Sequence, residues 1–351
     1  MRKMAMRKMA MTEILEGPEG IVAAVARLGL GEPIAFPTET VYGLGADALD
    51  VDAVERIFVL KGRPASNPLI VHVSGPEMAE DLVDEWTTDA QKLADAFWPG
   101  ALTLVLRKSE IVPDIVTAGG DTVAVRCPSH PIALGLIESL GKPIVGPSAN
   151  PSGSISPTTA DHVARGFEGE DVLILEGGSC RAGIESTVLD LTGDEPTILR
   201  PGVVTHTQIA RVLGRDVGFA GQNDGVARSP GMIGAHYQPS KPAYLKETSE
   251  IEGADSGVYL IAWSIESAET IDSWGGFSHL PPDAAGYARG LYNAMHEADD
   301  SDASAIWIEQ PPESDDTKKD FPIWHAVMER LSRACHPPKY PPKCPPNLPP
   351  K

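Results

Sequence analysis

Short apolar segments of strand length alternate with helical segments along most of this chain, and this order constrains its fold more than any other feature. Leu69–Val73 (LIVHV), Thr122–Arg126 (TVAVR) and Pro143–Gly146 (PIVG) have the length and composition of buried strands. Before them, Asp50 is placed to cap a helix over Val51–Lys61, whose apolar residues recur at helical spacing. Helices and strands interleave without a strict βαβ repeat, which predicts an α/β domain built on a twisted, mixed sheet.

The chain is long enough for a second domain. It has 351 residues, and about 100–200 residues is typical of one domain. A Gly-rich polar stretch over residues 216–228 has the composition of a linker. Beyond it, strand-like Val258–Ala262 and Ala305–Glu309 alternate with helical Asp283–Glu297 and Ile323–Ala334. A smaller α/β domain is therefore expected after the linker.

The two ends and the linker differ in composition from the domains. The N-terminus repeats MRKMA, and the C-terminus, HPPKYPPKCPPNLPPK, has the proline content of an extended, disordered tail. The segment Ser229–Pro239 (SPGMIGAHYQP) is too specific in composition for a passive linker. The expected division is a disordered extension over 1–17, a first α/β domain over 18–215, a linker with a closing loop over 216–243, a second α/β domain over 244–335 and a disordered tail over 336–351.

Composition argues against an exported, membrane-spanning or zinc-binding protein. No segment approaches the roughly 18 apolar residues of a membrane span, and no apolar stretch of signal-peptide length follows the basic N-terminus. The four cysteines form no CxxC pair, so we expect free thiols in a reducing cytoplasm rather than zinc ligands. The formal net charge of −20 disfavours non-specific binding to nucleic acid, which makes single lysines and arginines more informative than usual.

A nucleotide site in this chain must come from scattered residues, because neither GxxxxGK[ST] nor GxGxxG after a strand occurs. Lys61 and Arg63 follow a predicted helix, and Pro64 and Pro68 stiffen the loop that holds them beside Asn67. Two fixed cations suit a triphosphate, since adenylyl transfer depends mostly on positioning and charge stabilisation. Alternatively, this K-x-R pair is a favourable arrangement of cations at a helix C-terminus.

Two further segments place polar side chains at strand ends. Residues Gly146–Gly153 (GPSANPSG) put the Ser148 hydroxyl and the Asn150 amide after a strand, where ligands bind in open α/β sheets, although a plain Asn-Pro turn has the same composition. Arg126 ends an apolar strand, where it can pair with a carboxylate or leave the sheet for solvent.

Four other residues are weak candidates when taken alone. His72 interrupts the apolar strand LIVHV and is more typical of a core or edge histidine than of a ligand. Ser186 in GIESTVLD and Arg200 in ILRPG lack a distinctive pattern. Tyr237 lies in a loop full of glycine and proline, from which it could close over a site.

Six motifs together resemble the threonylcarbamoyl-AMP synthase family, in particular its YrdC-type domain. They are PTETVYGLG, which we expect to be a polar loop over Pro37–Gly45, followed by KGRPASNPLIVHV, FWPGALTLVL, TVAVRCPSH, GPSANPSG and IESTVLD, and they lie between about Gly31 and Gly214. The segment SPGMIGAHYQPSKPAYL and the unit after it resemble the long, two-domain form of the family. The resemblance implies a YrdC-like first domain, a smaller Rossmann-like α/β second domain and a loop over Ser229–Pro239 that closes on the site.

The resemblance also implies a reaction and a set of residues. L-threonine would take up CO2 from bicarbonate, and the new carboxylate would attack the α-phosphate of ATP. The products would be threonylcarbamoyl-AMP and pyrophosphate, the first step of N6-threonylcarbamoyladenosine modification of tRNA, which would make the protein a nucleotidyltransferase. The catalytic positions of the family correspond to Lys61, Arg63, Ser148 and Asn150. Its ATP contacts correspond to Arg63, Asn67, Thr122, Asn150, Thr158, Arg200 and Tyr237. Its threonine contacts correspond to Thr40, His72, Arg126, Ser148 and Ser186.

The same resemblance predicts the cofactor and the partners. Mg2+ would accompany the triphosphate, with no metal ion ligated by the protein itself. Other proteins would pass the product's acyl group to tRNA, and we also consider a weak contact with tRNA.

Three alternatives remain. An RNA-binding module is disfavoured by the net charge of −20, and a carbamoyl-adenylate enzyme of hydrogenase maturation by the missing CxxC pairs. An inactive regulatory homologue is disfavoured by the intact quartet of matching catalytic positions.

Overall fold

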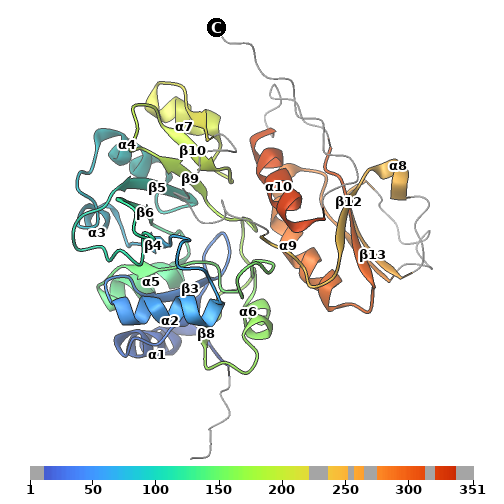
Figure 1. Cartoon of the computed structure of the whole chain (residues 1–351), viewed down its shortest axis with the longest axis horizontal. Helices are drawn as coiled ribbons and strands as arrows, with labels where there is room; N and C mark the ends of the chain where they lie inside the picture. The colour runs from blue at the N-terminus through green and yellow to red at the C-terminus, as the bar shows by residue number, and fades with distance from the viewer. Residues whose placement is uncertain (1–11, 221–235, 252–256, 265–274, 313–320, 337–351) are drawn as a thin grey trace, which may run out of the picture.

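The computed structural model describes residues 12–220, 236–251, 257–264, 275–312 and 321–336. These residues form two α/β domains that lie side by side (Figure 1). None of their helices is long and apolar enough to cross a membrane.

The first domain is built on an eleven-stranded sheet that mixes parallel and antiparallel pairs, as predicted. Its strands are β1 (Glu13–Leu15), β2 (Ile34–Phe36), β3 (Gly43–Asp47), β4 (Ile70–His72), β5 (Leu102–Arg107), β6 (Thr122–Arg126), β7 (Ile144–Val145), β8 (Leu173–Leu175), β9 (Thr187–Asp190), β10 (Thr197–Arg200) and β11 (Gly218–Phe219). They lie in the order β1-β8-β2-β3-β7-β4-β6-β5-β9-β10-β11. Its helices are α1 (Gly17–Gly29), α2 (Val51–Lys61), α3 (Pro76–Glu80), α4 (Thr88–Phe97), α5 (Pro131–Leu140), α6 (Ala160–Gly166) and α7 (His206–Leu213).

The described part of the second domain is a four-stranded parallel sheet with helices, which confirms the predicted smaller α/β unit. Its strands are β12 (Ala243–Lys246), β13 (Val258–Ala262), β14 (Gly276–His279) and β15 (Ala305–Glu309), in the order β12-β15-β13-β14. Its helices are α8 (Thr248–Ile251), α9 (Ala284–Asp300) and α10 (Phe321–Ala334). In Figure 1, α9 and α10 lie on the side of this sheet that faces the first domain.

Helix α2 begins and ends where its sequence predicts. The Asp50 carboxylate accepts hydrogen bonds from the backbone N–H groups of Asp52 and Ala53, which caps the helix. At the other end, Gly62 adopts a left-handed conformation with φ 60°, and its N–H bonds the carbonyls of Phe58 and Val59. These two signals position Lys61 as the last helical residue.

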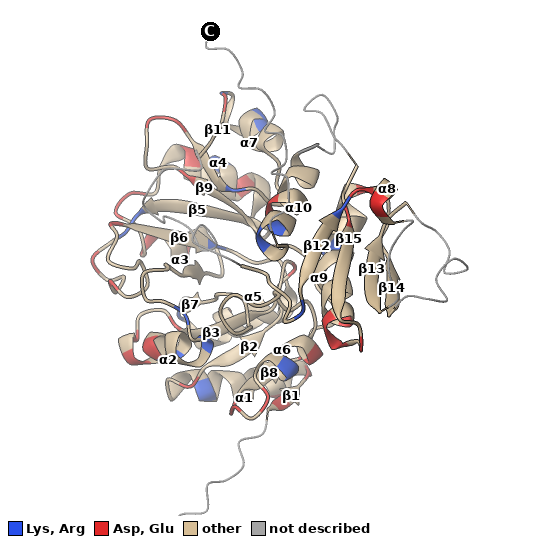
Figure 2. Cartoon of the chain, turned by 45° about the vertical axis from the view of Figure 1, so that its right-hand side comes forward, with Lys and Arg blue, Asp and Glu red and all other residues tan. Residues whose placement is uncertain are grey.

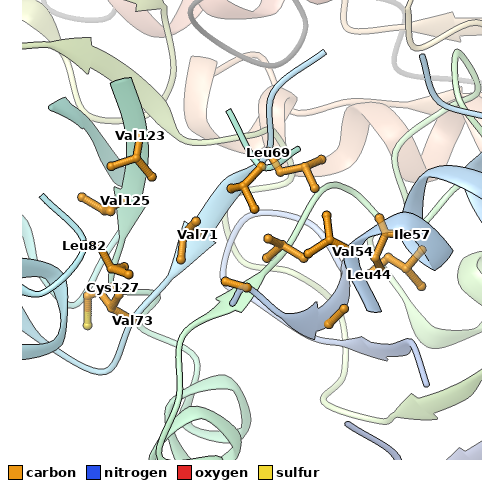
Figure 3. Packing of buried hydrophobic residues seen from close by; sticks show 14 of the residues in the cluster. Leu44, Val54, Ile57, Leu69, Val71, Val73, Leu82, Val123, Val125 and Cys127 are labelled. Atoms are coloured by element: carbon orange, nitrogen blue, oxygen red, sulfur yellow. The ribbon is translucent and has the colours of Figure 1, made fainter. Parts of the chain in front are cut away.

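Strands β4 and β6 divide their side chains between a hydrophobic core and the opposite face of the sheet, because side chains alternate along a strand. The residues that face the core, with Val54 and Ile57 of α2 packed in the same cluster, are labelled in Figure 3 and include Leu69, Val71, Val73, Val123, Val125 and Cys127. The alternate residues Ile70, His72, Ala124 and Arg126 therefore face the other way. Ile70 and Ala124 form a small separate apolar cluster there with Val105 and Val188.

The predicted polar loop over Pro37–Gly45 is wrong at its end, because β3 begins at Gly43. Two glycines let this strand pass close to a ring. A Cβ atom on Gly43 would lie 2.9 Å from the Phe36 ring, and one on Gly45 would lie 3.0 Å from both that ring and Ile144. The glycines that suggested a loop are required by this packing.

The predicted domain boundaries need three corrections. Residues 12–17 are not part of a disordered extension, because β1 pairs in parallel with β8 and Leu15 packs against the apolar cluster beneath α1. The linker is shorter than 216–243, because Gly218 pairs with Thr197 at one end and Ala243 starts β12 at the other. His336 donates its N–H to Ala243 rather than starting the tail. Residues 1–11, 221–235 and 337–351 lie outside the described residues.

The carboxylate of Glu309 occupies the carboxyl ends of the second domain's strands. It is fully buried at the end of β15. It accepts hydrogen bonds from the backbone N–H groups of Trp263, at 2.9 Å, and Ser264, at 3.0 Å, and from the Thr248 hydroxyl at 2.7 Å. The carboxylate therefore ties the chain after β13 to the chain after β12.

Candidate active site

Lys61 joins α2 to the segment that follows β7. Its side chain is buried, and Nζ donates to the carbonyl oxygens of Ser148 at 2.5 Å and Asn150 at 2.6 Å. Burial lowers the pKa of this ammonium well below its usual value, and the charge of Arg63 lowers it further. Lys61 is a basic residue in the last turn of α2, as the alternative interpretation expects, and its ammonium also contacts the Ser148–Asn150 segment.

Arg63 holds the loop that contains Asn67. Its Nε donates to the Asn67 carbonyl at 3.2 Å and its Nη2 to the Pro68 carbonyl at 3.0 Å. Burial lowers the pKa of Arg63 to about 10, an effect that nearby Tyr237 opposes and Arg200 reinforces. The guanidinium is thus a buried cation close to a second one.

Two buried amide oxygens near these cations have no hydrogen-bond partner among the described residues. They are Oδ1 of Asn67 and Oδ1 of Asn150. The Asn150 amide nitrogen is fully used, since it donates to the carbonyls of Pro151 and Ser154 at 3.1 and 2.8 Å. Buried acceptors without a partner are rare and costly in folded proteins, so both oxygens are available to a ligand that carries donors.

Arg126 and His72 are neighbours on adjacent strands, in register with one another. Arg126 does not leave the sheet for solvent: its Nη2 lies 2.7 Å from Oε1 of Glu39, and its Nε donates to the Gly100 carbonyl at 3.2 Å. His72 is buried against Phe36, and burial together with the charge of Arg126 lowers its pKa to about 3. His72 is therefore neutral at physiological pH, and its imidazole is available for hydrogen bonds.

Ser186 and Arg200 lie together although they come from different strand ends. Arg200 donates from Nε to the Ser186 carbonyl and from Nη2 to the Ser186 hydroxyl, both at 3.1 Å. The Ser186 hydroxyl also lies 2.8 Å from the Thr103 hydroxyl on β5. Sequence reasoning missed Thr103, although a single hydroxyl in the apolar run ALTLVLR was a signal.

The three predicted threonines make contacts of their own. The Thr40 hydroxyl is 2.8 Å from that of Thr38, and the Thr158 hydroxyl is 3.3 Å from Nδ1 of His162. Thr122 starts β6, so by alternation it shares a sheet face with Arg126, at the other end of the strand.

Tyr237 is the predicted residue that connects the two domains. It is 1% exposed, has a positive φ of 64° and stacks on Tyr292 of α9, with the ring centres 5.6 Å apart. The next residue, Gln238, donates its N–H to the Gly153 carbonyl of the first domain at 2.8 Å. His236 beside it was not predicted, and burial lowers its pKa to about 4. Most of the predicted closing loop, residues 229–235, lies outside the described residues.

The arrangement is matched by known proteins over both domains. The sequence model described as "Telomere recombination" (Sua5_yciO_yrdC) matches residues 27–202, and the one described as "Threonylcarbamoyl-AMP synthase, C-terminal domain" (Sua5_C) matches residues 204–335. A threonylcarbamoyl-AMP synthase of Pyrococcus abyssi (strain GE5 / Orsay) is 43% identical over 314 residues, which cover 87% of this chain and 90% of that protein. The chain belongs to the threonylcarbamoyl-AMP synthase family.

Other members of the family agree with this assignment. A threonylcarbamoyl-AMP synthase of Bacillus subtilis (strain 168) is 41% identical over 331 residues, which cover 90% of this chain and 92% of that protein. The crystal structure of P. abyssi Sua5 complexed with L-threonine superposes with a TM-score of 0.83 at 40% identity, covering 92% of this chain and 97% of that one. The two-domain architecture of the family is therefore present here.

The two carboxylates next to the candidate site residues already have partners within the protein. Glu39 is engaged by Arg126 and by the Ser129 N–H, and Glu185, beside Ser186, is engaged by Arg330 at 3.1 Å. Within the described ranges, no three His, Cys, Asp or Glu side chains gather closely enough to hold a metal ion. The carboxylates of Glu39 and Glu185 are thus already used within the protein.

Proposed function

We propose that this chain is an L-threonylcarbamoyladenylate synthase, a nucleotidyltransferase that converts L-threonine, bicarbonate and ATP into threonylcarbamoyl-AMP and pyrophosphate. The threonine amine adds CO2 derived from bicarbonate and loses a proton, which gives N-carboxy-threonine. A carboxylate oxygen of this carbamate forms a bond to the α-phosphorus of ATP. The bond between the α-phosphorus and the bridging oxygen breaks, and pyrophosphate leaves.

The observation that carries the proposal is a set of neighbouring buried cations. Lys61, Arg63 and Arg200 are 3%, 7% and 6% exposed; the charge of Arg63 lowers the pKa of Lys61, and the charge of Arg200 lowers the pKa of Arg63. Burying several like charges is unfavourable unless negative charge lies close by, either from the protein, as Glu185 supplies for Arg200, or from a ligand. The triphosphate of ATP, and the pyrophosphate that forms from it, supply that charge.

The remaining site residues suit the other substrate. Arg126 has used its Nε, so the outer edge of its guanidinium, which already contacts Glu39, is the part that would receive the threonine carboxylate. Neutral His72 and the Ser186 hydroxyl provide hydrogen bonds near it. The proposed synthase therefore acts mainly by positioning the carbamate against the α-phosphate, with Lys61 and Arg63 stabilising the developing charge.

Several finer expectations belong to the same proposal. Mg2+ would enter with ATP and neutralise part of the phosphate charge. The product would pass to proteins that transfer its acyl group to tRNA, and we expect the enzyme to act in the cytoplasm. Any contact with tRNA itself would be weak, because acidic residues are spread widely over both domains (Figure 2).

The test is pyrophosphate release by the purified full chain with ATP, Mg2+, bicarbonate and L-threonine, together with detection of an AMP-linked product. We expect release that requires both L-threonine and bicarbonate and that falls when L-serine replaces L-threonine. ATP turnover that is indifferent to threonine, or no turnover by folded protein, would contradict the proposal. Salt-sensitive binding of tRNA would then favour an RNA-binding module.

A further inference from the structure

Arg330 reaches from the second domain into the first. It lies on α10 with no exposed surface. Its Nε donates to Oε2 of Glu185 at 3.1 Å, and its Nη1 donates to the carbonyl of Pro201 at 2.5 Å. Nη1 also contacts Ala326 and Glu329 of its own helix, at 3.3 and 3.2 Å. One side chain of the second domain thus holds two separate segments of the first.

Glu185 is the centre of this contact. Its carboxylate accepts hydrogen bonds from the hydroxyl of Tyr292 on α9, at 3.1 and 3.3 Å, and from the hydroxyl of Ser156 at 2.7 Å. Burial raises the pKa of a carboxyl group, but the charges of Arg330 and Arg200 and the Ser156 hydrogen bond outweigh it, so the pKa of Glu185 lies below its usual value. Glu185 is therefore an ionised carboxylate inside the protein.

The two segments that Arg330 holds are those that carry Ser186 and Arg200. Glu185 directly precedes Ser186, and Pro201 directly follows Arg200. Arg200 bonds Ser186 through both its Nε and its Nη2. Arg330 of the second domain therefore connects the same two strand ends of the first domain that the Arg200–Ser186 hydrogen bonds connect.

The second domain also supports Tyr237. The Tyr237 ring stacks on the Tyr292 ring, and the Arg330 guanidinium carbon lies 6.0 Å from its centre. The same two side chains that bind Glu185 therefore back the aromatic residue expected to contact ATP. A buried ion pair is weak grounds for stability by itself, because desolvation offsets most of the attraction. Stability alone therefore does not explain why the Glu185–Arg330 ion pair lies between the domains and beside the site.

We infer that Arg330 and Tyr292 of the second domain are positioning residues for the reaction, and that they act through Glu185 by fixing Ser186 and Arg200 in the site. The second domain is then required for the full catalytic rate even though the candidate catalytic quartet lies in the first. The inference rests on the proposed synthase function.

The test compares Glu185→Gln, Tyr292→Phe, Arg330→Gln and the Glu185→Gln/Arg330→Gln double variant in the full chain. Asp300→Asn is the matched control, because it also removes the carboxylate of an ion pair between the domains, to Arg165 at 2.5 Å, but on the surface. Steady-state pyrophosphate release would give kcat and the KM for L-threonine and ATP, at a temperature where circular dichroism shows every variant folded. Calorimetric titration with L-threonine would measure binding independently of turnover.

We expect Glu185→Gln to lower kcat/KM for L-threonine by at least about tenfold, and Asp300→Asn to leave it within about twofold of the unsubstituted chain. Because Glu185 and Arg330 act through one contact, the double variant should fall within about threefold of the worse single variant. Tyr292→Phe removes one hydroxyl and keeps the ring, so it should show a smaller defect in the same direction. It also provides the test if Arg330→Gln does not fold.

Wild-type kinetics and threonine affinity in folded Glu185→Gln and Tyr292→Phe would overturn the inference, as would a defect of equal size in Asp300→Asn. The unsubstituted chain in the same assay separates this failure from that of the proposed function. If it releases no pyrophosphate with L-threonine and bicarbonate, the function is wrong. If it does so and the variants match it, only the positioning role is wrong.

Discussion

Replacing Lys61 by methionine removes the ammonium and keeps most of the aliphatic stem, so it tests the charge with little change in packing. In the folded protein the ammonium makes two hydrogen bonds, at 2.5 and 2.6 Å, to the segment that carries Ser148 and Asn150. Three N–H groups are available on a protonated lysine, which leaves one for a phosphate oxygen. The substitution therefore removes both a ligand contact and the tie that positions its neighbours.

The expected loss in catalysis is large. Removing one preorganised donor that stabilises developing charge costs about 10²–10³ in kcat, or roughly 2.7–4 kcal/mol. We expect Lys61→Met to lower kcat/KM for pyrophosphate release by a factor in this range. The free energy of unfolding should change less than the activation free energy. Two carbonyls lose their hydrogen-bond partner, which costs about 1–3 kcal/mol each, but the folded protein no longer has to bury a cation. The pKa of Lys61, lowered first by burial and then by Arg63, is consistent in direction with such a relief.

Lys142→Met is the matched control, since it makes the same chemical change on a lysine whose Nζ lies 2.6 Å from Asp47 and whose side chain is 57% exposed. The lysine is exposed but Asp47 is buried, so the substitution should leave activity unchanged and lower stability through loss of the cation beside that carboxylate. The assay is threonine- and bicarbonate-dependent pyrophosphate release, with urea unfolding measured in parallel. Folded Lys61→Met that keeps kcat/KM within about threefold of the control would refute the role given to this charge.

Three further predictions concern the aromatic contact, the helix cap and a histidine pair between the domains. Tyr237→Ala should weaken ATP binding and lower product yield, as measured by calorimetry and pyrophosphate release, and unchanged values for both would contradict its role over the site. Asp50→Ala should destabilise the protein by about 1 kcal/mol in urea unfolding through loss of the cap, whereas Glu55→Ala on the exposed side of the same helix should change stability by less than about 0.5 kcal/mol. His162, which stacks on His296 with ring centres 3.9 Å apart, has a pKa lowered to about 3, first by burial and then by His296. In the unfolded chain His162 takes up a proton at about pH 6.5, whereas in the folded protein it stays neutral there. The contribution of His162 to the free energy of unfolding is therefore complete above pH 6.5, and about 2 kcal/mol of it should be lost between pH 7 and pH 5. The difference in the free energy of unfolding between the unsubstituted chain and His162→Gln should therefore shrink from pH 7 to pH 5. A difference that does not depend on pH would contradict the lowered pKa of His162.

Local signals explain which elements could be predicted from sequence. A capping aspartate and a left-handed glycine define both ends of α2, and the apolar run TVAVR defines β6 and places Arg126 at its end. Strand β3 was missed because its glycines, which indicate a turn in most sequences, are needed here for close packing against Phe36. Propensity describes single residues, whereas this requirement comes from a tertiary contact.

The contacts between domains were beyond sequence reasoning for a different reason. Glu185 and Arg330 are 145 residues apart, and no local pattern pairs them. The one available signal was the position of Arg330 on the buried stripe of α10, between Val327 and Ala334, where an arginine is unusual unless it has a buried partner. Such a signal indicates that a partner exists but not which residue it is.

Glu309 bears on how selectively this protein could be inhibited. In open α/β sheets, ligands bind at the carboxyl ends of the strands, and backbone N–H groups commonly receive their phosphates there. In the second domain the N–H groups of Trp263 and Ser264 already hold the protein's own carboxylate. A nucleotide-shaped inhibitor would have to displace the buried Glu309 carboxylate, which accepts several hydrogen bonds, to bind at this position. Such an inhibitor should therefore bind the cationic site between Lys61 and Arg200 in preference to the second domain.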